Sequence, residues 1–133
     1  MALRCLSGVV LVAIVAAIDV RAHHSLTARY DPSKPITLTG TVTKIEWLNP
    51  HVRFYADVKD QDGKIVNWEF ELGAGTANLV RRGWTRTSLK AGDVITVEGS
   101  PARDGSALVN ASLVSLADGR RIFAGSPADG PPR

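Results

Sequence analysis

Cysteine is almost absent from this 133-residue chain, because Cys5 is its only one. A lone cysteine inside an N-terminal apolar run forms no intrachain disulfide, so a folded domain must depend on its hydrophobic core. Aromatic residues make up only 6% of the sequence, which argues against single-stranded nucleic-acid binding, since such sites stack bases on several aromatic side chains. The small net charge of +3 gives no reason to expect a polyanionic partner.

Long hydrophobic runs are also missing, except at residues 5–18. This run has the length of a signal-peptide core and falls short of the roughly 20 residues that cross a bilayer. Polar residues follow it, and Val20 and Ala22 satisfy the small-residue rule for cleavage after Ala22. We therefore expect a periplasmic or secreted protein with no transmembrane segment after processing. Cleavage after Ala17 and an uncleaved anchor helix are the alternatives.

Processing after Ala22 would leave 111 residues, which suits one small domain and not two. It would also remove Cys5, so the mature chain would have no thiolate chemistry, and its net charge would fall to +2. The organisation that we predict is a signal peptide (1–22), an extended N-terminal segment (23–36), a single β-barrel domain (37–125) and a flexible tail rich in proline and glycine (126–133).

The mature sequence alternates apolar and polar side chains as β-strands do. Residues 52–59 and 65–72 alternate cleanly, and residues 60–63 between them (Asp-Gln-Asp-Gly) are typical of a hairpin turn. Residues 37–47 predict a long first strand, whose apolar phase slips by one residue and so indicates a bulge or bend beside Gly40.

The later part of the chain contains one short helix and the remaining strands. Thr76 is the predicted N-cap of a helix that ends before Gly83. Strands are expected over residues 94–99 and 108–116, with 121–123 as a short last one. Three strands, a short helix and further strands predict a mainly β fold, namely a small five-stranded OB-like barrel with the helix between strands three and four. A partly open β-sandwich or roll is the alternative.

Six motifs of the mature chain form a recognisable set: His23-His24-Ser25, Gly40-Thr41-Val42, Trp47-Leu48-Asn49-Pro50-His51, Trp68-Glu69-Phe70-Glu71-Leu72-Gly73, Arg82-Gly83-Trp84 and Leu89-Lys90-Ala91-Gly92-Asp93. The set resembles a family of small exported bacterial proteins, known mainly as a domain of unknown function, and it runs over essentially the whole mature chain. The resemblance implies export across the inner membrane and a compact β-domain. It implies no activity and no catalytic residue.

The chain's three histidines, His23, His24 and His51, are the predicted metal ligands. Cleavage after Ala22 would free the α-amine of His23, which can chelate a metal together with its own ring Nδ1. His51 or His24 could add a further nitrogen. Such a nitrogen-rich set suits Cu(II), so copper is the one cofactor that we expect. In the alternative, no metal binds, His23 and His24 are exposed, and the His51 ring bonds local backbone.

Two other groups of charged residues are predicted to be structural. Glu69 and Glu71 share one face of a strand, where carboxylates more often serve solubility or pair with Arg53 and Lys64 than act as acid and base. The turn at residues 60–63 faintly resembles a calcium loop, but the first ligand position would be Val58, which excludes calcium there.

Trp84 lies in a basic stretch that is formed by Arg81, Arg82, Arg86 and Lys90. We expect Trp84 to pack over the end of the barrel and Arg81, Arg82 and Arg86 to be solvated. If the stretch binds anything, an acidic partner protein, an anionic headgroup or a sugar is favoured over nucleic acid. The serines offer no nucleophile elbow of the type Gly-x-Ser-x-Gly.

The sequence thus favours a small exported β-domain that binds a protein or small ligand in the cell envelope, with copper at its N-terminus. A metal-free interaction subunit of an envelope complex is the alternative. A copper-dependent oxidative enzyme comes third, because the chain shows no extended substrate surface.

Overall fold

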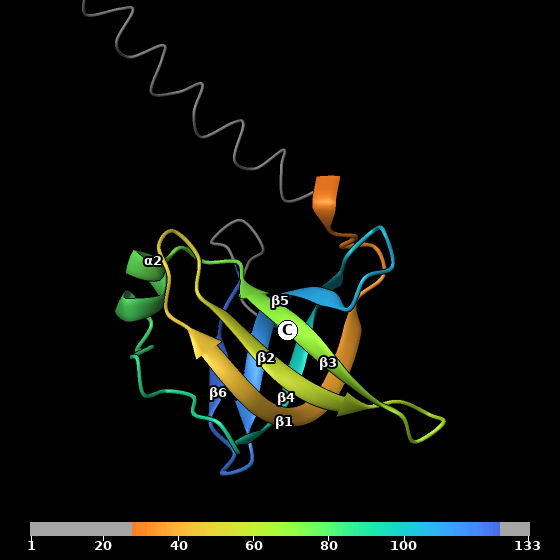
Figure 1. Cartoon of the computed structure of the whole chain (residues 1–133). Coiled ribbons are helices and arrows are strands. Elements are labelled where there is room, and N and C mark those ends of the chain that lie inside the picture. Colours follow the sequence, from red (N-terminus) through yellow and green to blue (C-terminus); the bar gives the residue numbers. More distant parts are fainter. Residues whose placement is uncertain (1–27, 126–133) are drawn as a thin grey trace, which may run out of the picture.

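The computed structural model describes residues 28–125, and within them six strands form one strongly curved sheet (Figure 1). The elements in chain order are β1 (Ile36–Glu46), β2 (Arg53–Lys59), β3 (Ile65–Leu72), α2 (Thr76–Arg81), β4 (Val94–Pro101), β5 (Leu108–Leu116) and β6 (Arg121–Phe123). The predicted order, with a short helix after the third strand, is confirmed.

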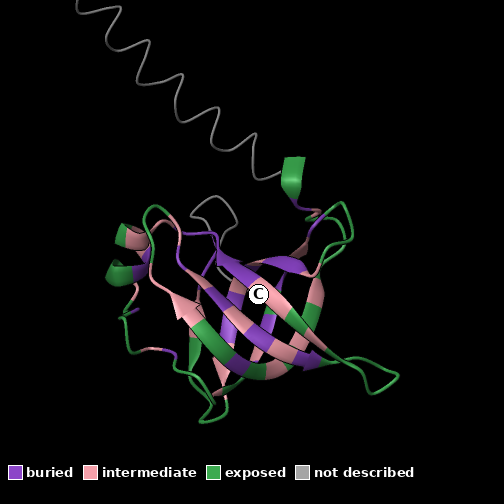
Figure 2. Cartoon of the chain, viewed as in Figure 1, coloured by how far each residue is buried: buried purple, intermediate pink, exposed green. Residues whose placement is uncertain are grey.

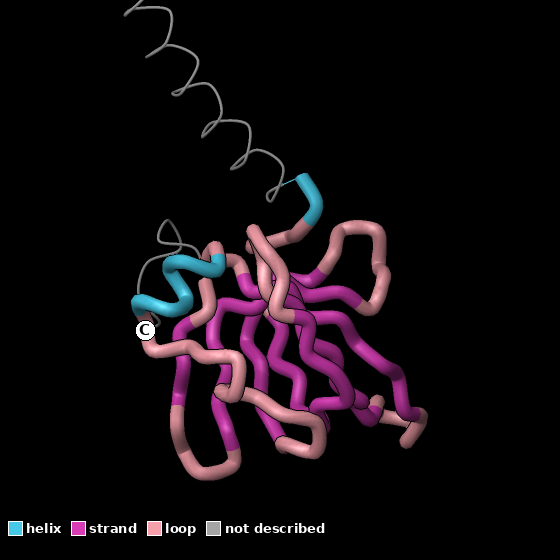
Figure 3. The backbone as a smooth tube through the Cα atoms, turned by 60° about the vertical axis from the view of Figure 1, so that its left-hand side comes forward, coloured by secondary structure: helices cyan, strands magenta, loops and turns pink. Residues whose placement is uncertain are grey.

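Five of these strands close into a barrel (Figure 3). β1 pairs antiparallel with both β2 and β4, while β2 pairs with β3 and β4 pairs with β5. β3 lies parallel to β5, from Glu69 beside Leu108 to Leu72 beside Ala111, and this pairing joins the two ends of the sheet. The OB-like five-stranded barrel is therefore confirmed, and the sandwich or roll is set aside.

The long first strand bends so that it can take part in both halves of the barrel (Figure 1). Its register against β2 shifts between Val42 and Lys44, which marks a bulge. The predicted slip is thus real but lies beyond Gly40 rather than beside it. Gly40 has another purpose, because a Cβ atom there would lie 2.6 Å from the carbonyl oxygen of Asp57 on β2. Only glycine lets the two backbones approach so closely.

Buried residues alternate with less buried ones along the strands (Figure 2), and the buried ones form the barrel core. Phe54 of β2 and Phe70 of β3 are completely buried and stack with their ring centroids 4.9 Å apart. Burial of a side chain of this size contributes about 1.5–3 kcal/mol to stability. Leu79 of α2 and Trp84 belong to the same core, and they close one end of the barrel.

The start of α2 differs from the prediction. Gly75 is the N-cap and no side chain caps the helix, because Thr76 is already its first residue. The Thr76 hydroxyl instead donates to the carbonyl oxygen of Leu48 (2.8 Å), and its backbone N–H donates to that of Pro50 (3.0 Å). Thr76 therefore ties α2 to the β1–β2 loop, whose Asn49–Pro50 peptide bond is cis.

β6 adds a short sixth strand to the barrel sheet. β3 pairs with β5 from Leu108 to Ala111, and β6 pairs with β5 from Leu113 to Ser115. The two short pairings lie one after the other along β5.

The described part of the chain has no helix that is long and apolar enough to span a membrane.

Candidate functional site

His51 is the one predicted metal ligand within the described residues, since His23 and His24 lie outside them. It is half-buried in the β1–β2 loop, just before the buried Val52. Its ring Nδ1 is buried and has no hydrogen-bond partner, so the backbone bond expected in the metal-free alternative is not made by that atom. Across residues 28–125 no three His, Cys, Asp or Glu side chains gather closely enough to hold a metal ion.

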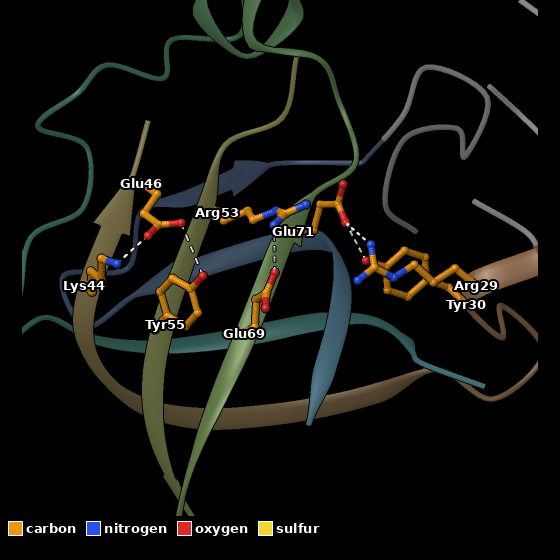
Figure 4. Close-up of polar contacts among 8 residues, drawn as sticks. All are labelled: Arg29, Tyr30, Lys44, Glu46, Arg53, Tyr55, Glu69 and Glu71. Carbon is orange, nitrogen blue, oxygen red and sulfur yellow. Dashed lines mark hydrogen bonds and ion pairs between the residues drawn. The ribbon is translucent and has the colours of Figure 1, made fainter. Parts of the chain in front are cut away.

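A buried carboxylate, Glu71, lies near the end of β3 under the N-terminal segment (Figure 4). It is only 4% exposed, although it occupies an outward position of the strand. The Tyr30 hydroxyl donates a 2.5 Å hydrogen bond to Glu71 Oε2, and Arg29 Nη1 lies 3.6 Å from the same oxygen. The predicted surface charge is thus a buried group, and Lys64 is not its partner in an ion pair.

Tyr30 is fixed by its backbone as well as by its side chain. It forms an isolated antiparallel bridge with Ala102 in the β4–β5 loop, where the Arg103 N–H donates to the Arg29 carbonyl oxygen (3.0 Å). Its ring packs in a small separate cluster with Ala102 and Leu108. Burial raises the pKa of the Tyr30 hydroxyl, and the hydrogen bond to Glu71 raises it further. We call this contact of Arg29 and Tyr30 with Glu71 the N-terminal latch.

The latch and His51 lie toward the same end of the β2–β3 pair. Glu71 is paired with Arg53, and one residue further the Leu72 N–H donates to the Val52 carbonyl oxygen (3.0 Å). The pairing therefore continues to the residue next to His51. With about 3.3 Å per residue along a strand and about 4.8 Å between strands, extending ideal strand geometry to His51 gives a separation of about 8 Å between the Cα atoms of Glu71 and His51.

Two further ion pairs lie on the outer face of β1–β3 (Figure 4). Lys44 pairs with Glu46, to which the Tyr55 hydroxyl also donates (3.2 Å). The Lys44 hydrogen bond lowers the pKa of the Glu46 carboxyl, and the same bond raises the pKa of Lys44. Glu69 Oε1 makes no hydrogen bond but lies 3.4 Å from Arg53 Nη1, so the predicted pairing of these two residues is confirmed.

The prediction for the stretch around Trp84, a packed tryptophan with solvated arginines, is confirmed in part. Trp84 is 2% exposed, and its Nε1–H donates to the Phe123 carbonyl oxygen (3.3 Å), so it packs into the barrel end as expected. Arg81 and Arg86 are exposed as predicted, although the Arg86 guanidinium lies 5.8 Å from the centroid of the Trp47 ring. Arg82 is less solvated than predicted, because it is half-buried and its guanidinium lies 4.3 Å from the centroid of the Phe123 ring. A base could not stack on Trp84 in this position.

A groove opens between the β1–β2 loop and α2, on the side where Arg86 covers Trp47. Leu48 and Val80 line it and are 50% and 57% exposed, respectively. We call it the α2 groove. Its apolar lining was not predicted from the sequence.

Comparison with known protein families accounts for most of the chain. The model of a family of unknown function, DUF6152, matches residues 10–110. The chain belongs to this family. The part that matches DUF6152 includes His23, His24 and His51 together with the latch and the α2 groove, and it ends within β5. No curated protein matches the sequence.

Proposed function

We propose that this member of DUF6152 is exported and that its barrel is a binding or accessory domain, which holds Cu(II) at the N-terminus of the mature chain. Export rests on the signal-like residues 1–22, which end in the small residue Ala22. In this proposal the metal is held by the α-amine and ring of His23, with His51 or His24 as a further ligand. The barrel serves as the scaffold that brings these groups together.

The observation that carries the copper proposal is the N-terminal latch. Tyr30 fixes the chain over Glu71 seven residues after His23, and Glu71 is about 8 Å from His51 by strand geometry. Seven residues reach at most about 25 Å when fully extended. The N-terminal segment is therefore long enough to return to the β1–β2 loop, and it starts from an anchor beside that loop rather than from the far end of the barrel.

The chemistry of the donors agrees with a cupric ion. A terminal amine and an imidazole nitrogen of the same residue bind Cu(II) as a chelate, and a third nitrogen completes a roughly planar set. The buried and unpartnered Nδ1 of His51 is a donor atom without another task in the described residues. Binding by the neutral ring and the free amine releases protons, so the affinity for copper should fall as the pH is lowered.

The deciding experiment compares four forms of the protein by calorimetry with Cu(II). We expect the form that begins at His23 to bind one equivalent, and a form with an additional Gly-Ser at its N-terminus to bind at least tenfold more weakly. His51→Ala should weaken binding if His51 is the third ligand, whereas His24→Ala should do so if His24 is. Equal affinities of the first two forms would overturn the terminal chelate.

Native mass spectrometry of the exported protein tests the remaining part of the proposal, because it reports the N-terminus and the bound metal together. A mature chain that begins at His23 is expected. A chain that begins after Ala17, or one that retains its first 22 residues, would remove the free amine of His23 and with it the proposed site.

A metal-free interaction subunit of an envelope complex is the second candidate function. The observation that favours it is the α2 groove, whose exposed Leu48 and Val80 leave apolar surface without a covering segment among the described residues.

A further inference from the structure

The arginines of the described region divide into two groups by their partners. Residues 28–125 contain eight arginines, and five of them form ion pairs with carboxylates: Arg29, Arg53, Arg103, Arg120 and Arg121. The other three, Arg81, Arg82 and Arg86, form no ion pair with a carboxylate of the described residues. All three lie in the six residues that end α2 and lead away from it.

The contacts of these three arginines are neutral. Arg81 Nη1 lies 3.5 Å from Asn78 Oδ1, and Arg82 Nη1 donates to the Gly125 carbonyl oxygen. The Arg86 guanidinium covers Trp47, 5.8 Å from its ring centroid. α2 also lacks an acidic residue in its first turn, so nothing on the helix itself offsets this charge. The positive charge at this end of the barrel is therefore available to a partner.

Part of the unpaired charge adjoins the α2 groove, because Arg86 lines it and Arg81 follows its lining residue Val80 in the chain. Leu48 and Val80 are two of the four large apolar side chains that are strongly exposed in the described residues, and both line this groove with Trp47 and Arg86. Thr76 fixes the two walls relative to each other, because it bonds the β1–β2 loop from the first residue of α2. The groove is thus preformed, apolar at its centre and cationic at its edge.

We propose that the α2 groove docks an acidic segment of a partner protein. One aliphatic side chain of the segment inserts between Leu48 and Val80, and flanking Asp or Glu residues pair with Arg81 and Arg86. A guanidinium presents a planar pair of donors that matches a carboxylate, and its stacking on Trp47 keeps the Arg86 group in place before the partner arrives. Because the barrel supplies no carboxylate to these arginines within the described residues, the partner segment is expected to supply it.

Concavity favours a protein segment over a membrane surface. An anionic bilayer would supply negative charge as well, but it is flat on this scale and cannot enter a groove between a helix and a loop. Apolar residues that anchor a protein in a bilayer protrude from it, whereas Trp47 and Ala77 line the walls of this groove. The inference goes beyond the copper proposal and needs neither His23 nor a bound metal.

Selection from a displayed library of random peptides tests the proposal, using the mature protein with a chelator present throughout. We expect the selected peptides to share an aliphatic residue flanked by Asp or Glu. Binding of a selected peptide should weaken about fivefold to tenfold in Arg81→Gln and in Arg86→Gln, and it should fall as salt is raised. Val80→Asp should abolish binding, because it places a carboxylate in the apolar centre.

Arg121→Gln is the matched control, since this arginine is ion-paired with Glu98 and lies on β6. It should leave peptide binding unchanged, and circular dichroism should show that all four variants are folded. The proposal is overturned if no peptide is selected, if the selected peptides are neutral or basic, or if Arg81→Gln and Arg86→Gln bind as well as the unchanged protein. Flotation with vesicles of anionic phospholipid that depends on the same arginines would also overturn it, in favour of a membrane.

Discussion

The outer face of β1–β3 and the α2 groove handle charge in opposite ways. On the strand face, Lys44 is paired with Glu46 and Arg53 with Glu69, while the N-terminal latch covers Glu71. Arg81, Arg82 and Arg86 contact neutral groups within residues 28–125. A surface whose charges are matched internally gains little from another ion pair, because the new partner must compete with the existing one. These three arginines have no such competitor in the part of the chain that the structure describes, so they mark the better place to look for a protein partner.

The largest effect that we expect concerns the two sides of α2. Leu79→Ala should lower the free energy of unfolding by about 2–5 kcal/mol, because Leu79 is completely buried in the barrel core. Val80→Ala, one residue further, should change it by no more than about 0.5 kcal/mol, because Val80 is 57% exposed. Urea unfolding followed by tryptophan fluorescence measures both. Comparable losses would mean that the groove face of α2 is part of the core after all.

The next effect tests the latch against an exposed counterpart. Tyr30→Phe removes the only side-chain hydrogen bond that Glu71 accepts within residues 28–125. Because this leaves a buried carboxylate without a donor, the free energy of unfolding should fall by about 1–3 kcal/mol. Tyr55→Phe removes a similar hydroxyl from the partly exposed Glu46 and should cost about 0.5 kcal/mol. Both free energies come from urea unfolding at neutral pH. A larger loss for Tyr55→Phe would show that the latch does not hold the N-terminal segment.

The stability of the protein at alkaline pH gives a second test of the latch. The folded protein holds the Tyr30 proton more tightly than the unfolded chain, because burial and Glu71 raise the pKa of Tyr30 above its ordinary value of 10.0. Its contribution to stability is therefore complete below about pH 10 and decreases as the pH rises further.

The variant Tyr55→Phe makes this measurable, since it leaves Tyr30 as the only tyrosine. Ultraviolet absorbance should then show tyrosinate only as the barrel unfolds, which circular dichroism monitors in parallel. Ionisation near pH 10 in a folded barrel, where an unperturbed tyrosine titrates, would contradict the buried latch.

The smallest effect compares a paired with an unpaired arginine. Arg53→Gln should cost about 1 kcal/mol, since it leaves the buried Glu69 Oε1 without its cation. Arg86→Gln should cost no more than about 0.5 kcal/mol, because no carboxylate of the described residues depends on it. Thermal unfolding in low and high salt gives both values, and the Arg53→Gln difference should shrink in high salt. A greater cost for Arg86→Gln would indicate that its stacking on Trp47 is structural.

Much of the barrel could be predicted because its signals are local. Alternation marked β2 and β3, the turn that ends in Gly63 marked their connection, and Gly83 marked the end of α2. The N-cap of α2 was predicted wrongly because the Thr76 hydroxyl bonds a carbonyl group of the β1–β2 loop instead of the helix. The sequence alone does not distinguish a threonine that bonds across the fold from one that caps its own helix.

The candidate sites were predictable only as residue types. His51 could be selected as a histidine in a turn, but the lack of a partner for its Nδ1 follows from burial, which no local pattern reveals. Glu71 was expected at the surface because alternation places it on the outer face of β3. What buries it is Tyr30, 41 positions earlier in the chain, whose role is set by a single long-range contact. The unpaired state of the arginines likewise depends on where every carboxylate lies.

The division of the β5 edge between β3 and β6 has a consequence for self-association. β3 reaches only as far as Ala111, so β6 is the element of the described residues that pairs with β5 from Leu113 to Ser115 on that side. β6 lies beyond the region that matches DUF6152. A chain shortened before Arg121 would lose this pairing and present an unprotected strand edge, onto which the same strand of another molecule could add.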